Sequence, residues 1–232
     1  MLTFVYYIKY FFYIALNWNI RLALFSIYHE VKGERKYNIN TSRLDDLKHL
    51  SVKGYNRNEA EIYQGANYYL LENVFTQLRR LNAPVDITDI GSGKGRVMVV
   101  AAHYGFTTIT GVDFARALCQ EAENNCRIIT KRFPLAEWKV LHANAFNFKF
   151  RKDDHVLFFF NPFKEPVMNQ VIKNILQSLK EYPRKMFVVY MNPQHRNLFV
   201  SAGFKEVYYI KRMQFVDAVI YVFLTTPWLK KH

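Results

Sequence analysis

The sequence predicts an α/β fold, with a doubly wound and mostly parallel sheet of seven strands. From residue 85 onward, short apolar runs typical of buried strands alternate with longer helical patterns, which is the order expected of a parallel sheet. A glycine-rich turn joins the first of these strands to the next helix, as in nucleotide-binding sheets of this class. The β-rich runs at 205–211 and 215–225 follow one another directly, so the sheet should end in an antiparallel pair.

The individual elements follow from local patterns. The first helix should end at the basic residues Arg79 and Arg80, and Pro84 then separates it from the first strand. Gly203 should end the last short helix. Strands are expected at 85–90, 107–112, 138–142, 155–160 and 185–191, and helices at 59–81, 95–104, 114–131, 165–181 and 194–202.

The composition excludes a disordered chain. Half of the 232 residues are hydrophobic and 22% are charged, which provides enough apolar material for a packed core. The formal net charge of +13 favours an anionic partner, such as nucleic acid, an anionic membrane surface or an acidic substrate. The basic residues are scattered along the chain, however, and solubility explains such a distribution at least as well. Nucleic acid is therefore not the favoured partner.

The two cysteines, Cys119 and Cys126, predict neither a disulfide nor a metal site. They lie seven residues apart in a helical stretch, which puts them two turns apart on one face and too far apart for a disulfide. No CxxC motif or Cys/His cluster indicates a metal. We expect a reducing, cytoplasmic location, with neither cysteine near the ligand crevice.

Residues 2–28 are almost entirely apolar and aromatic, interrupted by Lys9 and by polar residues at 17–21. A cleavable signal peptide is not expected, because Met1 leads directly into apolar residues without a basic start. Lys9 and the polar patch also disfavour a membrane-spanning helix. Two interpretations remain open. Residues 1–28 either make peripheral contact with a membrane at its inner face, or pack as helices on the catalytic domain or in a homo-oligomer.

A change of composition after this segment divides the chain. Residues 31–58 are polar, include Gly33 and Gly54, and resemble a linker with a short helix near 43–50. We therefore expect an N-terminal helical segment with its linker at 1–58 and a single α/β domain at 59–232.

The segment Asp86-Ile-Thr-Asp-Ile-Gly-Ser-Gly-Lys-Gly95 is the most informative part of the sequence. Gly91, Gly93 and Gly95 lie between a strand and a helix, where glycines permit a sharp turn and close approach of a ligand to the main chain. Arg96 follows, so the spacing is GxGxG and not the GxGxxG of dinucleotide sites. A Walker phosphate loop is excluded, because no Lys-Ser or Lys-Thr follows at the required spacing.

Asp113 ends the next predicted strand, in Ile-Thr-Gly-Val-Asp. An acidic residue about 20 positions after the glycines can accept hydrogen bonds from both ribose hydroxyls of an adenosine. Asp89 and Asp113 would each also suit the start of a helix, as capping residues. Because both acids occur at the expected spacing on the expected elements, we favour a cofactor site.

Three segments together, Asp89-Ile-Gly-Ser-Gly-Lys-Gly95, Asp113 and Asn161-Pro-Phe163, resemble the class I S-adenosylmethionine-dependent methyltransferases. The resemblance is greatest to small bacterial members that carry DxGSGKGR, GV(D/E) and FNPF in this order. It covers residues 63–226 and not the N-terminal segment. It implies a Rossmann-like methyltransferase sheet and S-adenosylmethionine as the cofactor.

The resemblance implies a role for each matching residue. Gly91 and Gly93 give room to the amino-acid end of the cofactor, and Asp89 anchors its ammonium group directly or through water. Asp113 binds the ribose. Further cofactor-binding residues implied by the resemblance are Ser92, Ala145, Asn161 and Tyr63, of which Tyr63 caps the methionine end from a preceding helix.

The adenine end of the site departs from the family pattern at one position. Phe114 would flank the adenine ring. Asn144, in His-Ala-Asn-Ala-Phe146, stands where family members often have an aspartate that contacts the adenine amino group. The asparagine amide can contact the ring but lacks the charge.

The candidate catalytic residues are Asn161, Pro162 and Phe163, which follow the apolar strand at 155–160. The carboxyl end of a central strand faces the ligand crevice of an open α/β sheet. An asparagine oxygen can accept a hydrogen bond from an amino group and so orient its lone pair, and an aromatic ring can stack on a flat acceptor. The motif resembles the Asn-Pro-Pro-aromatic signature of amine and amide N-methyltransferases, shortened by one proline. A simple turn after the strand is the alternative.

A second Asn-Pro pair, Asn192-Pro193, ends the next strand. Adjacent parallel strands would place both pairs on one rim, with Tyr190 and His195 close by. His195 could act as a base for an oxygen acceptor, but the opening of a helix explains it better.

The leading hypothesis is therefore an S-adenosylmethionine-dependent methyltransferase that acts by direct displacement on a nitrogen of a small molecule or a protein amine. Two alternatives stay open. One is an RNA or DNA methyltransferase, which the positive charge motivates. The other is a non-catalytic, membrane-associated binding module with a methyltransferase fold.

Overall fold

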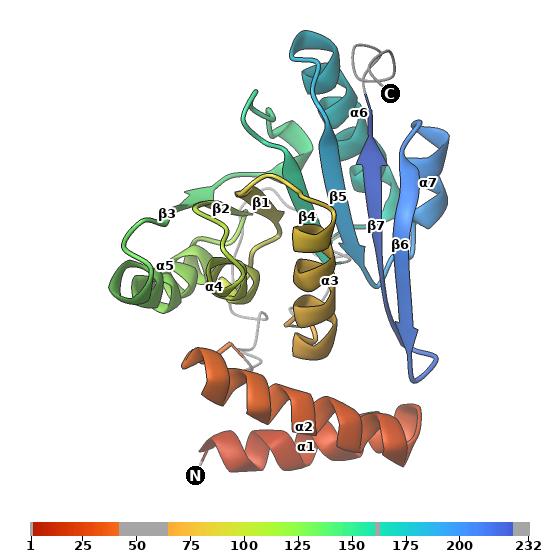
Figure 1. Cartoon of the computed structure of the whole chain (residues 1–232). Helices are drawn as coiled ribbons and strands as arrows, with labels where there is room; N and C mark the ends of the chain where they lie inside the picture. The colour runs from red at the N-terminus through yellow and green to blue at the C-terminus, as the bar shows by residue number, and fades with distance from the viewer. Residues whose placement is uncertain (1, 42–64, 161–162, 225–232) are drawn as a thin grey trace.

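The computed structural model describes residues 2–41, 65–160 and 163–224. Its centre is a seven-stranded sheet in the order β3-β2-β1-β4-β5-β7-β6 (Figure 1). The strands β1 to β5 are parallel, and β7 runs antiparallel between β5 and β6, so six strands point one way. The predicted fold class and its antiparallel C-terminal pair are confirmed. The bounds are β1 Asp86–Ile90, β2 Thr108–Asp113, β3 Glu137–His142, β4 Val156–Phe160, β5 Met186–Met191, β6 Lys205–Arg212 and β7 Val216–Phe223.

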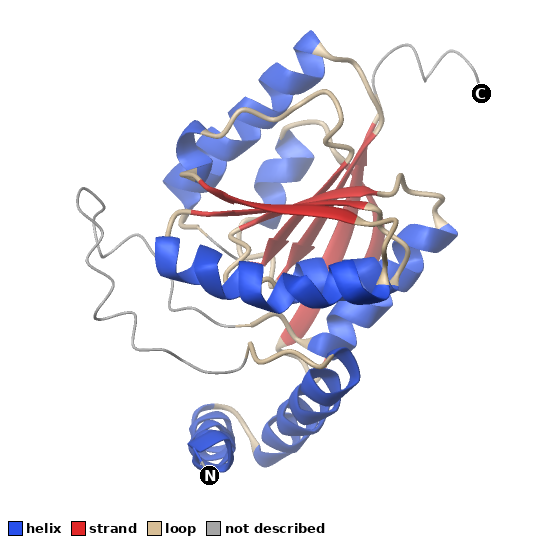
Figure 2. Ribbon diagram, turned by 90° about the vertical axis from the view of Figure 1, so that its left-hand side faces the viewer, coloured by secondary structure: helices blue, strands red, loops and turns tan. Residues whose placement is uncertain are grey.

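Helices cover both faces of the sheet (Figure 2). One apolar core lies between the sheet and α3, α4 and α5, and a second lies between the opposite face and α6 and α7. The bounds are α3 Tyr68–Arg80, α4 Arg96–His103, α5 Arg116–Arg132, α6 Glu165–Glu181 and α7 Arg196–Ser201, and a short 3-10 helix, η2, spans Ala145–Asn147.

The central strand β4 shows why the sequence dictates this arrangement. Its residues 156–160 are all apolar, because a parallel strand covered on both faces has no side that meets water. Successive side chains alternate between the two cores: Phe158 packs into the first, and Leu157 and Phe159 pack into the second.

The chain before the sheet forms a helical hairpin. Helix α1 spans Leu2–Asn17 and α2 spans Ile20–Tyr37. Asn19 begins α2, because its side chain accepts a hydrogen bond from the Leu22 backbone nitrogen at 2.8 Å. Helix α1 lies farthest from the sheet and α2 lies between α1 and α3 (Figure 1). Within the described residues, neither helix is long and apolar enough to cross a membrane.

Two expected boundaries were wrong. The polar stretch expected to begin a linker at residue 31 is helical as far as Tyr37, where Asn38 ends α2 in a left-handed conformation. The helix expected from residue 59 begins at Tyr68, because the Asn67 side chain caps it by accepting from the Leu70 nitrogen. Residues 42–64, including the short helix expected near 43–50, lie outside the described part.

Candidate functional site

The glycine turn after β1 is held against β2 by its own backbone. Gly91, Gly93 and Gly95 all have positive φ, at 83°, 51° and 79°, which residues with a side chain rarely adopt. The nitrogens of Gly91 and Ser92 both donate to the Val112 carbonyl, at 2.8 and 3.0 Å. The turn is therefore shaped by glycine conformation and fixed to the neighbouring strand.

Asp113 lies next to this turn, as its position at the end of β2 predicts. One carboxylate oxygen accepts from the Gly93 nitrogen at 2.9 Å, and the other accepts from the Ala115 nitrogen at 2.9 Å. Asp113 is 5% exposed. Burial raises its pKa, although the two backbone hydrogen bonds act in the opposite direction. The carboxylate thus ties the glycine turn to the start of α5.

Asp89 is the more unusual of the two acids. It is 3% exposed, and among the described residues no group donates a hydrogen bond to one of its oxygens, Oδ2. Burial, and next the negative charge of Asp113, raise the pKa of Asp89 well above its ordinary value. A buried carboxylate without a partner is costly, and a cationic group beside it would remove that cost. The chemistry here fits a ligand that carries a positive charge.

A small hollow opens beside Asp89 at the carboxyl edge of the sheet. Its floor is formed by the glycine turn, its sides by the start of α4 and the segment before α3, and one wall by the last residue of β4. The residues that line it are Gly65, Ala66, Asp89, Gly91, Ser92, Arg96, Val97 and Phe160. The predicted residues Asp89, Gly91 and Ser92 are therefore brought together around one space.

Arg96 is a site residue that the sequence analysis missed. It is 2% exposed, although it directly follows the glycine turn. Its guanidinium forms a two-pronged ion pair with Glu30 of α2, at 2.5 and 2.9 Å, and also donates to the Ala66 carbonyl at 2.8 Å. It lies over the Tyr68 ring, 4.3 Å from the centroid. Arg96 therefore connects the glycine turn to the N-terminal hairpin and to the wall of the hollow.

Two further groups complete this cluster. Thr41 accepts a hydrogen bond from Arg96 Nε at 2.7 Å, and Glu34 lies 3.3 Å from Arg96 Nη2. Gly65 is required by packing, because a Cβ atom there would lie 2.5 Å from the Arg96 guanidinium carbon. A signal was present in the sequence: Glu30 and Glu34 are one helical turn apart, and the helix needs a cation to bury them.

The predicted adenine-end residues lie at the ends of β2 and β3. Phe114 is half-buried, and His142 at the end of β3 donates to its carbonyl at 2.9 Å. The Asn144 side-chain oxygen accepts from the Phe146 nitrogen at 2.9 Å and so begins η2, while Ala145 is buried. These residues lie near the Asp113 edge of the site. Tyr63 lies outside the described residues.

The predicted acceptor residues are described only in part. Asn161 and Pro162 fall outside the described residues, but both neighbours are placed. Phe160 lines the hollow, whereas Phe163 is buried in the second core with Val167 and Met168. Phe160 and Phe163 therefore lie in different environments, one at the hollow and the other in the second core.

The second Asn-Pro pair follows a neighbouring strand, as expected, because β5 pairs with β4 in parallel. Asn192 adopts a positive φ of 49°. Tyr190 is fully buried in the second core, and His195 stands immediately before α7. His195 therefore opens a helix.

Neither cysteine lines the hollow, but both pack against elements that form the site. Cys119 Sγ lies 3.5 Å from the Asp113 carbonyl, and a Cβ atom added at Gly95 would lie 3.1 Å from Cys126 Sγ. Both cysteines are free and buried directly beneath the cofactor turn. Burial raises the pKa of Cys119 to about 11 and also raises that of Cys126, so both remain thiols and act as small packing residues.

A family model for a methyltransferase domain matches residues 87–182, which include the glycine turn, Asp113 and the end of β4. The chain therefore carries a methyltransferase domain, and its sheet has the fold of the class I S-adenosylmethionine-dependent methyltransferases. No curated protein sequence matches this methyltransferase.

Solved structures support the fold of the methyltransferase. It is similar to magnesium protoporphyrin IX methyltransferase from Synechocystis PCC 6803 with bound S-adenosylhomocysteine, with a TM-score of 0.52 and 11% identity over 66% of this chain and 80% of that one. The chain is also similar to the methyltransferase domain of bacterial CtHen1-CN, with a TM-score of 0.52 and 14% identity over 68% of this chain and 100% of that one. A third similar structure is the Pyrococcus abyssi tRNA (uracil-54, C5)-methyltransferase, with a TM-score of 0.51 and 17% identity over 69% of this chain and 40% of that one.

Replacement of Arg96 by methionine should strongly destabilise the methyltransferase, because it leaves Glu30 buried without its cation. We expect the free energy of unfolding in urea to fall by about 3–5 kcal/mol. The double variant Arg96→Met/Glu30→Met should recover part of this loss. The control is Arg127→Met on the exposed side of α5, which should change stability by no more than about 0.5 kcal/mol. Equal stability of the Arg96 and Arg127 variants would contradict the role given to this ion pair.

Proposed function

We propose that this methyltransferase transfers the methyl group to a nitrogen atom of a small molecule or a protein amine. The observation that carries the cofactor half of the proposal is the buried, unsatisfied carboxylate of Asp89 beside the glycine turn. The acceptor half rests on Asn161 and Pro162, which follow directly on Phe160 at the wall of the same hollow, whereas Phe163 packs in the second core.

The cofactor would be held by residues at two strand ends. Asp89 would bind the ammonium group of the amino-acid end, because a buried carboxylate with a raised pKa gains most from a cation. Gly91 and Gly93 would leave space for this end of the cofactor, and Ser92 lines the same hollow. Asp113 would accept hydrogen bonds from the ribose hydroxyls, since each of its oxygens already accepts one hydrogen bond and has a second lone pair.

The adenine would lie between the ends of β2 and β3. We assign Phe114 to one face of the ring, and Asn144 and Ala145 to its edge. The Asn144 oxygen is engaged by the Phe146 nitrogen, which leaves its NH2 group as the part suited to contact a ring acceptor. We assign Tyr63 to the methionine end.

The chemistry needs little from the protein beyond alignment. S-adenosylmethionine supplies a methyl group that its sulfonium already activates. The Asn161 side-chain oxygen would accept a hydrogen bond from the acceptor amine and aim its lone pair at the methyl carbon. Phe160 and the apolar end of β4 would exclude water from the path of transfer.

Asp113→Ala should weaken S-adenosylmethionine binding by about 100-fold or more, because two hydrogen bonds to a charged group are lost at about 1.5–3 kcal/mol each. Isothermal titration calorimetry measures this directly, and circular dichroism shows whether the variant is folded. Asp153→Ala is the matched control, since this aspartate is exposed at the opposite, amino-terminal edge of the sheet. An unchanged Kd for a folded Asp113 variant would refute the cofactor assignment.

Cofactor affinity should fall as the solution becomes acidic. The raised pKa of Asp89 means that its carboxyl takes up a proton at a higher pH than an ordinary aspartate would, and the neutral acid no longer balances the ammonium charge. Below that pKa, Kd should rise by up to about tenfold per pH unit. Asp89→Asn should bind weakly at neutral pH and show a much shallower pH dependence, measured by calorimetry from about pH 8 to about pH 5. A slope that persists unchanged in this variant would assign the effect to another group.

Asn161→Ala should lower kcat on the order of 100-fold, through loss of acceptor alignment, with a far smaller effect on cofactor Kd. Asn192→Ala, at the end of the neighbouring strand, is the control. Transfer of a tritiated methyl group to a panel of amines and lysine-containing proteins identifies the acceptor atom. Release of labelled methanol in alkali indicates a methyl ester and would overturn the proposal, as would an alkali-stable product in which tandem mass spectrometry places the methyl group on oxygen or carbon.

A further inference from the structure

The outer surface of the N-terminal hairpin is unusually rich in exposed apolar side chains. Leu16 at the end of α1 is 83% exposed, and Ile20 at the start of α2 is 59% exposed. Most of the others are aromatic. The exposed large apolar residues of the two helices are Ile8, Phe12, Tyr13, Leu16, Trp18, Ile20, Leu24 and Tyr28. We call these residues, together with the exposed cations Lys9, Arg21, Lys32, Arg35 and Lys36, the hairpin surface.

On the hairpin, the acidic side chains face the interior of the protein and the basic side chains face solvent. Across residues 7–37, all of which the structure describes, every exposed Lys, Arg, Asp or Glu side chain is a cation. The two acids of the hairpin, Glu30 and Glu34, turn inward to Arg96. The exposed cations are Lys9, Arg21, Lys32, Arg35 and Lys36. The hairpin surface therefore combines aromatic and aliphatic groups with positive charge only.

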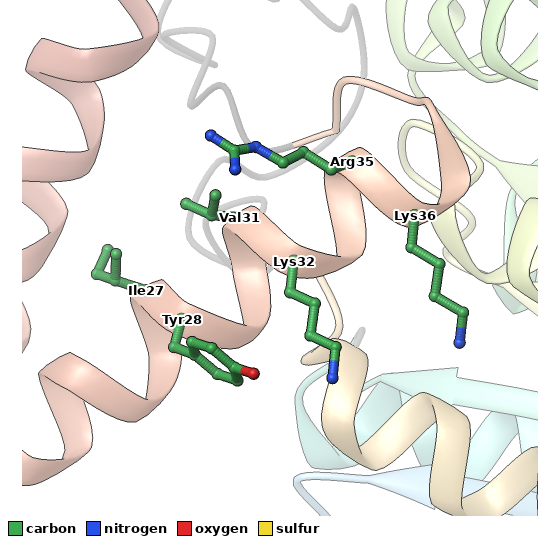
Figure 3. A pocket seen from close by; sticks show the side chains of 6 residues that line it. All are labelled: Ile27, Tyr28, Val31, Lys32, Arg35 and Lys36. Atoms are coloured by element: carbon green, nitrogen blue, oxygen red, sulfur yellow. The ribbon is translucent and has the colours of Figure 1, made fainter.

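A shallow groove on α2 shows this combination at close range. Its lining combines apolar and cationic side chains, and Figure 3 shows Lys32 and Lys36 extending from one side of α2 and Arg35 from the other. Lys32 lies 5.6 Å from the centroid of the Tyr28 ring, while Lys36 reaches Glu72 of α3 at 2.6 Å. The lining residues are Ile27, Tyr28, Val31, Lys32, Arg35 and Lys36.

The turn between β6 and β7 extends the same surface. Met213 and Phe215 are exposed at its tip, next to the exposed cations Lys211 and Arg212. Val216, at the start of β7, packs against the small apolar cluster that joins α1 to α2. The turn therefore lies beside the hairpin and adds both apolar and basic groups to it.

We propose that the hairpin surface docks on an anionic lipid bilayer. Aromatic side chains favour the boundary between headgroups and acyl chains, and lysine and arginine stems extend from that boundary to anionic headgroups. Nucleic acid fits less well, because its interfaces are polar and offer nothing to Leu16, Ile20 or Leu24. A second copy of the chain fits less well too, because a twofold interface would bring like charges together.

This docking is independent of the acceptor proposed above, but it has a consequence for the site. The hairpin contacts the glycine turn through Arg96, so the hairpin surface and the hollow lie at the same end of the sheet. A docked methyltransferase would hold its carboxyl edge toward the membrane.

Vesicle co-sedimentation of the full chain tests the proposal. The protein should sediment with mixed phosphatidylcholine–phosphatidylglycerol vesicles, much less with phosphatidylcholine alone, and less as salt is raised. Lys9→Ser/Arg21→Ser should weaken the apparent affinity about 10- to 30-fold. Leu16→Ser/Trp18→Ser should weaken it too, by removing inserted groups. Lys173→Ser/Lys180→Ser, which removes the same charge from exposed positions on α6, should have little effect.

Folding and cofactor binding of each variant are checked by circular dichroism and calorimetry, so a docking defect is separable from loss of the site. Absence of vesicle binding would overturn the proposal, as would equal binding to neutral and anionic vesicles or an equal loss in the α6 control. Sedimentation equilibrium showing a dimer that the Leu16→Ser/Trp18→Ser variant abolishes would assign the surface to a second copy. Salt-sensitive binding of a single-stranded RNA oligonucleotide, without vesicle binding, would assign it to nucleic acid.

Discussion

The buried guanidinium of Arg96 is the constraint on which the arrangement of this protein depends. It stands at the first position of α4, immediately after the glycine turn, and it is almost completely removed from water. A cation in that position requires acids nearby, and Glu30 provides a two-pronged pair from a helix 66 residues earlier in the chain. The same guanidinium fixes the Ala66 carbonyl at the wall of the hollow. The ion pair between Arg96 and Glu30 thus joins the N-terminal hairpin to the glycine turn.

A second constraint is the pair of acids at the ends of β1 and β2. Asp113 is satisfied by backbone nitrogens, whereas Asp89 keeps one oxygen unsatisfied, and burial together with the charge of Asp113 raises the pKa of Asp89. Their difference suits a ligand with a neutral polar part and a cationic part. Glycine conformation, the two buried thiols beneath the turn and the Val112 carbonyl together hold this edge in one shape.

The sequence predicted the sheet well because its signals are local. A short apolar run such as 156–160 is typical of a strand covered on both faces, and Gly91, Gly93 and Gly95 mark a turn that needs positive φ. The sequence did not predict that α2 continues to Tyr37, because its polar C-terminal part has the composition of a linker. Only the distant Arg96 explains why Glu30 and Glu34 lie in a helix that packs on the domain. The position of Cys119 near Asp113 was missed for the same reason, since helical spacing gives a face but not what that face meets.

The inward turn of the two glutamates also determines what the outside of the hairpin can be. Both acids of α2 pair with the buried Arg96, so the charged side chains that α2 exposes to solvent are all cations. These cations are Arg21, Lys32, Arg35 and Lys36. Stabilising the site and creating a basic surface are therefore two consequences of one arrangement. A shift of α2 that weakened the ion pair between Glu30 and Arg96 would therefore be transmitted to the glycine turn through the Arg96 side chain. The ion pairs of Arg96 with Glu30 and Glu34 thus link the helix that carries the basic surface to the glycine turn.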